Sequence, residues 1–355
     1  MKNFMNVILL GTSYKIAPLK VRERYSFSKK QLAQTYRLLY NEVIRETVIL
    51  STCNRTEIYA TTDYLGEVRE FLCEELRITN YELQYFYFLE NEDVIKHLFR
   101  VAGGLDSQVV GESQILGQVR NAYFQAKELG ITGEYLNKLF QKAIEVGKIV
   151  REKTKISEGN VSIGSVALKM IENLWGNLKG KKILIIGTGK IGELIAKYLV
   201  DRGIAGTFVA NRTYEKAKEL AEKINGKAVR FNFLRDEIRV TDVIISATAS
   251  PHLILGKEMV QEIMESREKP LYIMDLALPR DVDPESKNIN NVFLYNLDDL
   301  NLIVEENYKK RMKEGKKAER IIEKEAGEFW QCLNKLLITD KERRLGLVPA
   351  QVAWL

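Results

Sequence analysis

The chain has 355 residues, of which 45% are hydrophobic and 29% are charged, and its net charge is +6. At about 100–200 residues per domain, this length predicts two or three globular domains, and the modest charge permits an anionic partner without requiring one. Three scattered cysteines exclude a disulfide framework and a cysteine metal cluster, so we expect free thiols and no bound metal.

The N-terminal stretch "MKNFMNVILLGTSYK" contains an apolar run that is too short for a signal peptide. No run approaches the roughly 20 residues of a membrane span, so we expect a cytoplasmic protein without membrane contact. Residues 1–155 mix short strand-like runs such as "NVILLGT", "TVILST" and "LQYFYFLE" with helical stretches, which predicts an α+β domain. From about residue 115 the pattern is helical, with apolar residues at three- and four-residue steps from Tyr135 to Val150.

Residues 156–296 alternate between strand and helix patterns. "KKILIIG" predicts a buried strand, "ELIAKYLVDRG" a helix, "GTFVA" a strand and "YEKAKELAEKING" a second helix. Further strand-like runs follow in "DVIISATA", "PLYIMDLA" and "NVFLYNL". This alternation predicts a parallel sheet covered on both faces, the doubly wound α/β domain of the Rossmann type.

Residues 297–355 are helical and rich in charge. A seam of apolar residues persists at Ile322, Ala326, Phe329, Leu333 and Leu336. A helix of about 40 residues would be roughly 60 Å long, so we expect it to run beside other domains or to pair with a second chain. The alternative is a terminal helix that is solvated on all sides.

The glycines of "ILIIGTGKIGELIAKYL" have the G-x-G-x-x-G spacing, at Gly187, Gly189 and Gly192. The motif follows a predicted buried strand and opens a predicted helix, the context in which it binds a dinucleotide. Gly187 permits the tight turn, Gly189 lets the backbone approach a pyrophosphate, and Gly192 permits close packing of helix on strand. The alternative is a strand–helix turn without a ligand.

The next predicted strand ends in "FVANRT", where an NAD site places an acidic residue for the ribose 2′-hydroxyl. This chain has Asn211 and Arg212 there, and a guanidinium can bind a 2′-phosphate with two parallel hydrogen bonds. We therefore expect NADPH rather than NADH. The alternative for Arg212 is an exposed cation at the start of a helix.

Cys53 lies in "ILSTCNRTEIYA", where an apolar run ends and polar residues begin. Taken alone, such a cysteine is more often a buried packing residue than a nucleophile. Its place at a strand end and the nearby Arg55 favour a nucleophile, because cations stabilise a thiolate.

A second polar segment, "HLFRVAGGLDSQVVGESQILGQVR", covers residues 97–120 and is otherwise apolar enough to be buried. Its hydrogen-bonding side chains need partners, and a polar substrate is one candidate. His97, one of two histidines in the chain, is either a structural residue on a helix or a participant in the chemistry.

These motifs, together with "MDLALPRDVDP", resemble glutamyl-tRNA reductase in their order over about residues 7–335. In that family a cysteine attacks the ester that joins glutamate to tRNA, and NADPH reduces the thioester to glutamate-1-semialdehyde, the first committed step to tetrapyrroles. The resemblance implies a catalytic domain at 1–155, an NADPH domain at 156–296 and a helical dimerisation region at 297–355. It also implies a homodimer, and an aminomutase as the partner that receives the aldehyde.

The resemblance assigns roles position by position. Cys53 matches the nucleophile, and His97 matches a histidine important for activity. The substrate-binding positions are Thr52, Cys53, Asn54, Arg55, Ser107, Glu112, Ser113, Gln114 and Gln118, with Arg55 suited to the glutamate carboxylate. The cofactor-binding positions are Gly187, Thr188, Gly189, Lys190, Ile191, Gly192, Asn211 and Arg212.

The sequence also departs from the family pattern. Ser113 stands where proline is usual, "GTSYKIAP" differs from the commoner Asn-His opening, and the helical region ends early, at Leu355. Two other readings stay open. One is a shikimate-dehydrogenase-like oxidoreductase, which needs no cysteine, and the other is a tRNA-binding or scaffold protein that retains a cofactor fold.

Overall fold

The computed structural model describes residues 5–112, 114–157, 163–175, 178, 180–201, 204 and 207–344. The chain divides into two compact units, one formed by residues 1–160 with 308–355 and the other by residues 161–307. Within the described residues, no helix has both the length and the apolar character that a membrane crossing requires. The same residues contain no group of three or more His, Cys, Asp or Glu arranged to hold a metal ion.

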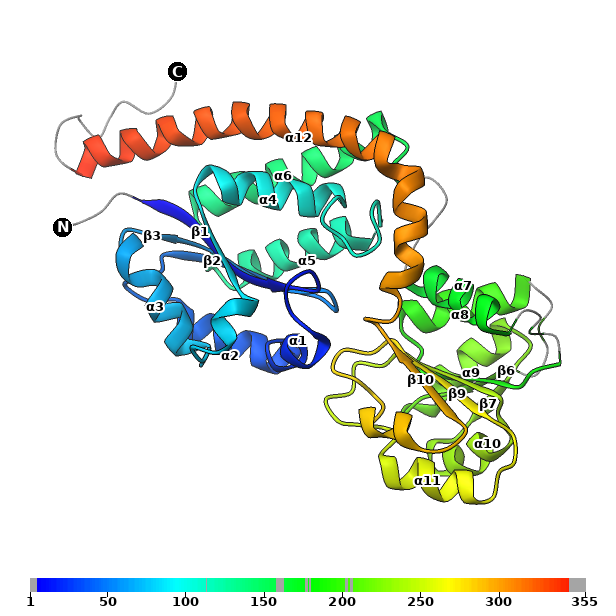
Figure 1. Cartoon of the computed structure of the whole chain (residues 1–355). Coiled ribbons are helices and arrows are strands. Elements are labelled where there is room, and N and C mark those ends of the chain that lie inside the picture. The colour runs from blue at the N-terminus through cyan, green and yellow to red at the C-terminus, as the bar shows by residue number, and fades with distance from the viewer. Residues whose placement is uncertain are drawn as a thin grey trace. The chain divides into compact units, whose positions relative to one another are not determined.

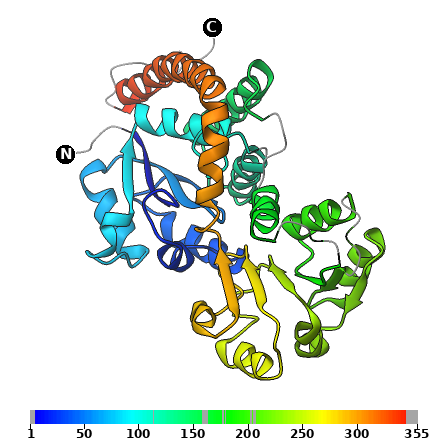
Figure 2. The same ribbon diagram turned by 45° about the vertical axis from the view of Figure 1, so that its right-hand side comes forward.

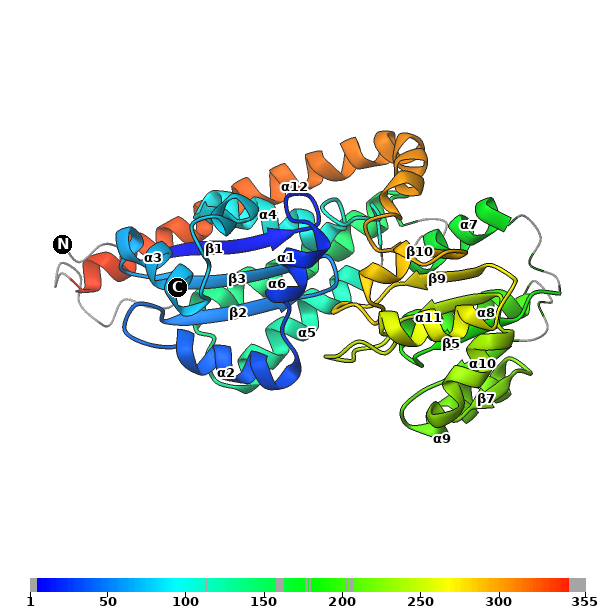
Figure 3. The ribbon, with the colours of Figure 1, turned by 60° about the horizontal axis from the view of Figure 1, so that its bottom comes forward.

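The first unit is built on a four-stranded antiparallel sheet in the order β2-β3-β1-β4 (Figure 1). Its elements are β1 (Asn6–Ser13), α1 (Leu19–Arg24), α2 (Lys29–Leu39), β2 (Glu46–Ser51), β3 (Arg55–Thr62), α3 (Leu65–Glu75), β4 (Tyr87–Glu90), α4 (Glu92–Gly103), α5 (Gln114–Glu128) and α6 (Glu134–Lys153). All eight residues of β3 are buried, whereas a sheet with one wet face would alternate. The reason is that α2 and α3 cover one face of the sheet and α4, α5 and α6 the other (Figure 3).

The long helix α12 (Asn301–Arg344) has 44 residues, which corresponds to about 66 Å. Its predicted apolar seam is confirmed, since Ala318, Ile322, Ala326 and Leu333 join the hydrophobic core of the first unit. Lys142 on α6 pairs with Glu325 at 2.8 Å, and Arg100 on α4 pairs with Glu319. The solvated-helix alternative is therefore wrong. Because the seam is already covered, a homodimer would need another surface, and the dimer stays a prediction.

The second unit contains a six-stranded sheet in the order β10-β9-β8-β5-β6-β7, in which every strand pair is parallel (Figure 2). Its strands are β5 (Ile183–Ile186), β6 (Thr207–Ala210), β7 (Lys227–Val229), β8 (Val243–Ser246), β9 (Leu271–Asp275) and β10 (Val292–Asn296). Its helices are α7 (Ile163–Trp175), α8 (Lys190–Asp201), α9 (Tyr214–Lys223), α10 (Leu234–Val240) and α11 (Lys257–Glu265). The strand order reverses beside β5, as in a doubly wound dinucleotide-binding domain, which confirms the predicted fold class.

One local prediction needs correction. The run "LQYFYFLE" is not one strand, because Glu82–Tyr85 form a short 3-10 helix and only Tyr87–Glu90 pair with β1. The helical pattern predicted from about residue 115 is confirmed by α5 and α6, and before it α4 occupies Glu92–Gly103 with one apolar face in the core. A non-helical loop then separates α4 from α5, and it carries several of the predicted substrate-binding residues.

Candidate active site

The turn that joins β2 to β3 places Cys53 at the tip of an antiparallel hairpin. The Thr52 amide donates to the Arg55 carbonyl at 2.8 Å. The Thr52 hydroxyl oxygen accepts from the amides of Asn54 and Arg55, both at 3.2 Å. A threonine side chain that bonds to the backbone two and three residues later stabilises a tight turn. Thr52 therefore fixes the turn locally, and Cys53 projects from it, half-buried and without a disulfide.

Cys53 is a protonated thiol in the free protein. Burial raises the pKa of the thiol to about 12, and the Glu112 carboxylate adds to the rise. The guanidinium groups of Arg22 and Arg55 lower the pKa, and Arg22 has the larger effect of the two. The expectation that Arg55 favours the thiolate therefore has the right direction, but Arg22 contributes more.

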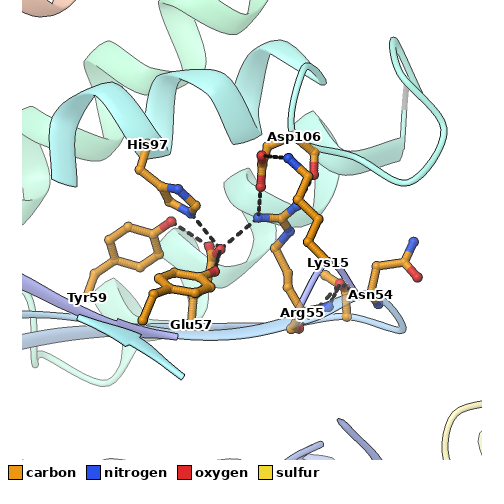
Figure 4. A network of polar contacts seen from close by, with 9 residues as sticks. Lys15, Asn54, Arg55, Glu57, Tyr59, His97 and Asp106 are labelled. Atoms are coloured by element: carbon orange, nitrogen blue, oxygen red, sulfur yellow. Dashed lines mark hydrogen bonds and ion pairs between the residues drawn. The ribbon is translucent and has the colours of Figure 1, made fainter. Parts of the chain in front are cut away.

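Arg55 is instead part of a buried network of charges (Figure 4). Its side chain is 1% exposed, and its Nη1 donates to Glu57 Oε1 at 2.7 Å and to Asp106 Oδ2 at 3.0 Å. Its Nη2 donates to the Asp106 carbonyl, and Lys15 binds the other oxygen of the Asp106 carboxylate. Two carboxylates thus hold Arg55 rigidly and compensate much of its charge.

Glu57, whose side chain is fully buried, lies at the centre of this network. Besides Arg55, its carboxylate contacts His97 Nε2 at 2.7 Å, Tyr59 Oη at 2.6 Å and Tyr87 Oη at 2.5 Å. Although burial disfavours the charged form, Arg55 and His97 hold the pKa of the Glu57 carboxyl well below its usual range. An ionised carboxylate only accepts hydrogen bonds, so Nε2 of His97 carries the hydrogen of this bond.

His97 lies in the buried network, where it contacts Glu57 and not the cysteine turn itself. In Figure 4, His97 and Asn54 lie on opposite sides of Arg55. Among the described contacts, His97 reaches the turn only through Glu57 and Arg55. Its ring packs on that of Tyr87, with 5.3 Å between ring centroids.

The loop between α4 and α5 brings Ser107 and Glu112 into the first unit's interior. Arg151 on α6 anchors both ends of this loop. Its Nη1 donates to the Ala102 carbonyl at 2.7 Å, and its Nη2 donates to the Glu112 carbonyl at 3.2 Å. These bonds fix the position of the Glu112 backbone next to the start of α5.

Three buried polar side chains of this site lack protein partners among the described residues. Asn54 Oδ1 and Ser107 Oγ form no hydrogen bond, although the two residues are 6% and 3% exposed. No hydrogen bond or ion pair is formed by the Glu112 carboxylate within the described part of the chain, and burial raises its pKa to about 7. Because buried polar groups require partners, this arrangement favours a polar ligand beside the cysteine.

Two other predicted substrate-binding residues lie on α5. Gln114 and Gln118 are half-buried and one helical turn apart on α5, so they share a face. Ser113 lies outside the described residues.

In the second unit, the glycine loop has the geometry that its spacing predicts. Gly187 follows β5 with a φ of 107°, and a Cβ there would lie 2.5 Å from the Ala247 carbonyl oxygen. A Cβ on Gly192 would lie 2.3 Å from the Gly187 carbonyl oxygen, whereas nothing lies within 4 Å of one on Gly189. The backbone at Gly189 is therefore open to a ligand at the start of α8, where a helix N-terminus attracts anions.

Asn211 and Arg212 lie at the end of β6, beside this loop. Asn211 Nδ2 donates to the Thr188 hydroxyl at 2.6 Å, which ties the loop to the neighbouring strand. Asn211 and the exposed Arg212 line a cavity of about 190 Å³, together with Ile186, Phe231, Thr248, Ala249, Ser250, Pro251 and Ile254. The cavity opens at the carboxyl ends of the strands, where doubly wound sheets bind nucleotides.

The motif "MDLALPRDVDP" supplies two buried carboxyl groups that shape this cavity. Asp281 accepts hydrogen bonds from the Ser246 hydroxyl at 2.6 Å and from the Thr248 hydroxyl at 2.5 Å. Asp275 accepts from the amides of Asp281 and Val282, both at 2.9 Å. Burial raises the pKa of Asp275 to about 7. These bonds hold the loop after β8, against which Gly187 packs.

Comparison with known proteins identifies the family. Residues 10–154 match the family described as glutamyl-tRNAGlu reductase, N-terminal domain, and residues 169–303 match shikimate / quinate 5-dehydrogenase. The sequence is 41% identical to the glutamyl-tRNA reductase of Geotalea uraniireducens, over 99% of this chain and 85% of that protein. The chain belongs to the glutamyl-tRNA reductase family.

Other relatives agree with this assignment. The glutamyl-tRNA reductase of Bacillus subtilis is 42% identical over 94% of this chain and 74% of its own length. The solved structure of glutamyl-tRNA reductase from Methanopyrus kandleri superimposes with a TM-score of 0.52 at 38% identity, covering 97% of this chain and 83% of that one. As a member of this family, the protein is an NAD(P)-dependent oxidoreductase. The two alternatives from the sequence, a shikimate-dehydrogenase-like enzyme and a scaffold protein, do not explain why residues 10–154 match the N-terminal domain of glutamyl-tRNA reductase.

The sequence analysis did not identify several residues of the site. Glu57 and Tyr59 lie inside the buried strand β3. The glutamate in "RTEIYA" could have indicated a buried charge network, because a charge is seldom buried without partners. Arg22 and Tyr87 gave no comparable signal. Their partners lie 31 and 30 positions away in the chain, a separation that only the fold brings together.

Proposed function

We propose that this protein reduces the glutamyl ester of glutamyl-tRNA to glutamate-1-semialdehyde with NADPH, through a thioester on Cys53, as the first committed step toward tetrapyrroles. The observation that carries the proposal is the half-buried thiol at the tip of the β2–β3 hairpin. It is accompanied by the buried Asn54 Oδ1 and Ser107 Oγ, which have no hydrogen-bond partner among the described residues, and by the buried Glu112 carboxyl group. The family of the chain supports the same substrate and reaction.

The thioester step balances with residues of this site. The sulfur of Cys53 attacks the ester carbonyl, and the thiol proton passes to the Glu112 carboxylate. As the carbon–oxygen bond breaks, Glu112 returns the proton to the departing ribose oxygen, which leaves free tRNA and a glutamyl thioester. A carboxyl group whose pKa is about 7 suits both transfers, because its proton affinity lies near neutral pH.

The cofactor would lie in the second unit, where the open backbone at Gly189 and the cavity beside Arg212 fit a dinucleotide. Bound NADPH would supply the hydride that reduces the thioester to the aldehyde. Sulfur donates little electron density into the carbonyl, so a thioester accepts hydride more readily than an ester does. Release of the aldehyde leaves the Cys53 thiolate, which takes up one proton from the solvent and so restores the thiol.

An assay of NADPH oxidation with three substrates tests this function. Consumption is expected with glutamyl-tRNA and is expected to be absent with free glutamate or with uncharged tRNA. Consumption with shikimate and none with glutamyl-tRNA would contradict the proposal. This assay does not test two further predictions, namely that an aminomutase takes over the aldehyde and that the protein is a homodimer.

The preference for NADPH predicts a specific effect of Arg212→Asp. The substitution removes a guanidinium that can bind the 2′-phosphate, a contact worth about 1.5–3 kcal/mol, and introduces a repelling charge. Titration should show NADPH affinity falling by at least roughly tenfold, while NADH affinity stays the same or rises. The Lys216→Met variant, at an exposed position on α9, controls for a general loss of positive charge. Equal changes for both cofactors would show that Arg212 does not read the 2′-phosphate.

Two variants of His97 distinguish three roles that are compatible with its contact with Glu57. If His97 positions Glu57 and Arg55, His97→Ala should lower turnover by about 100-fold, and His97→Asn, which keeps a donor, should retain more activity. If His97 transfers a proton, both variants should lose about 10²–10⁴-fold. If it only packs, the melting temperature should fall while activity per folded molecule is unchanged. The structure favours the first result, and measurement of turnover and melting on one preparation distinguishes all three.

A further inference from the structure

We propose that Arg22 is the positioning residue for the Cys53 thiolate: it fixes the cysteine turn from α1 and provides the positive charge that stabilises the ionised sulfur. The inference rests on the proposed nucleophilic role of Cys53. It assigns to Arg22 a role that the sequence pattern had suggested for Arg55.

The geometry of Arg22 suits a positioning role. The residue is 2% exposed, and its Nη1 donates to the carbonyl oxygen of Cys53 itself at 2.7 Å. Its Nε donates to the Ala17 carbonyl at 3.2 Å, just before α1 begins. A planar guanidinium held at both of these atoms has little freedom to turn. Arg22 therefore links the segment before α1 to the tip of the hairpin.

Arg55 has a different set of partners, although it follows Cys53 by two positions. It is bound to the carboxylates of Glu57 and Asp106, which hold it on the side of the network that contains His97. Its orientation is set by those two carboxylates, and its hydrogen bonds do not involve the Cys53 carbonyl. The side chain that reaches the Cys53 backbone is that of Arg22.

Among the described residues, three charged groups that act on the thiol come from three different elements. Arg22 belongs to α1, Arg55 to β3 and Glu112 to the loop before α5. Burial and Glu112 disfavour the thiolate, Arg22 opposes them, and Arg55 contributes less than Arg22 does. A nearby opposite charge typically lowers a pKa by about 1–3 units, so loss of Arg22 should make the thiolate at least tenfold rarer at a given pH.

Alkylation of Cys53 in the whole protein tests the proposal without tRNA or NADPH. Rates with neutral iodoacetamide and anionic iodoacetate are measured by mass spectrometry of the Cys53 peptide, at pH values where the thiol predominates. The variants are Arg22→Gln, which keeps a donor and loses the charge, and Arg22→Lys, which keeps both. Lys20→Met removes an exposed charge from the same helix and serves as the control.

Arg22→Gln should slow alkylation by iodoacetamide about tenfold. It should also lower the ratio of the iodoacetate rate to the iodoacetamide rate by about threefold or more. This ratio depends on the charge near the sulfur and not on how accessible the sulfur is. Arg22→Lys and Lys20→Met should leave both readouts near the wild-type values.

An unchanged ratio in Arg22→Gln, with equal slowing in Arg22→Lys, would overturn the proposal and reduce Arg22 to a residue that shapes the turn. If Arg22→Gln does not fold, Arg22→Lys still decides, since tenfold slower alkylation in a folded variant that keeps the charge contradicts the electrostatic role. These outcomes are separate from failure of the proposed function, which would appear as reductase turnover by a Cys53→Ser variant.

Discussion

Cys53→Ser is expected to abolish reduction of glutamyl-tRNA while leaving the fold and NADPH binding almost intact. Serine is close in size to cysteine, and the side chain is half-buried at a hairpin tip, so little packing is lost. A serine hydroxyl is a much weaker nucleophile than a thiolate, and the oxygen ester it would form is a poorer hydride acceptor than a thioester.

The measurement combines NADPH oxidation with glutamyl-tRNA, titration of NADPH and thermal unfolding. Cys73→Ser is the matched control, because Cys73 is also half-buried in the first unit and lies on α3, away from the hairpin tip. Normal turnover by Cys53→Ser would rule out covalent catalysis at this position.

Glu112→Gln is expected to lower turnover by about 10²–10⁴-fold, the usual contribution of a positioned proton-transfer group. Glutamine has nearly the same shape, and the Glu112 carboxylate forms no hydrogen bond within the described part of the chain, so the variant should fold normally. Glu128→Gln, on the exposed face of α5, controls for loss of one negative charge. Turnover within threefold of wild type would remove Glu112 from the mechanism.

The same substitution should change how stability depends on pH. Burial raises the pKa of Glu112 from 4.5 to about 7, so the folded protein binds more protons than the unfolded chain between these values. The contribution of Glu112 to the unfolding free energy should therefore fall as pH rises from about 4.5 to 7. Glu112→Gln removes this part of the fall and should be more stable at pH 8, by at most about 3 kcal/mol.

Denaturant titrations at pH 5 and pH 8 measure this effect. Asp275, whose pKa is also raised to about 7 by burial, should leave part of the pH dependence in the variant. A gain in stability together with a loss of turnover is the pattern expected of a group retained for function at a cost in stability. Identical pH dependence in variant and wild type would show that burial does not raise the pKa of Glu112.

The sequence predicted those features that depend on neighbouring residues. The strand–glycine–helix order of residues 183–201 specifies a local turn, and the position of Cys53 at a strand end is also local, so both could be read directly. The doubly wound sheet followed from the alternation of strands and helices.

Features that depend on long-range packing could not be predicted in this way. Glu57 binds His97 across 40 positions, and Arg22 binds Cys53 across 31. The seam of α12 showed that one face is apolar but not which surface covers it. The raised pKa of Glu112 depends on burial, which no spacing of residues indicates. Arg55 was assigned by its nearness in sequence, whereas its partners are set by the folded network.

Mass spectrometry of the enzyme after incubation with glutamyl-tRNA, with NADPH omitted, tests the proposed mechanism most directly. Without hydride transfer the thioester has only slow hydrolysis as an outlet, so acid quenching should trap it. We expect the peptide that contains Cys53 to gain the mass of one glutamyl group, and we expect the gain to disappear when NADPH is added before the quench. Turnover with NADPH but no adduct on Cys53 at any time of quenching would contradict the thioester and with it the role proposed for this cysteine.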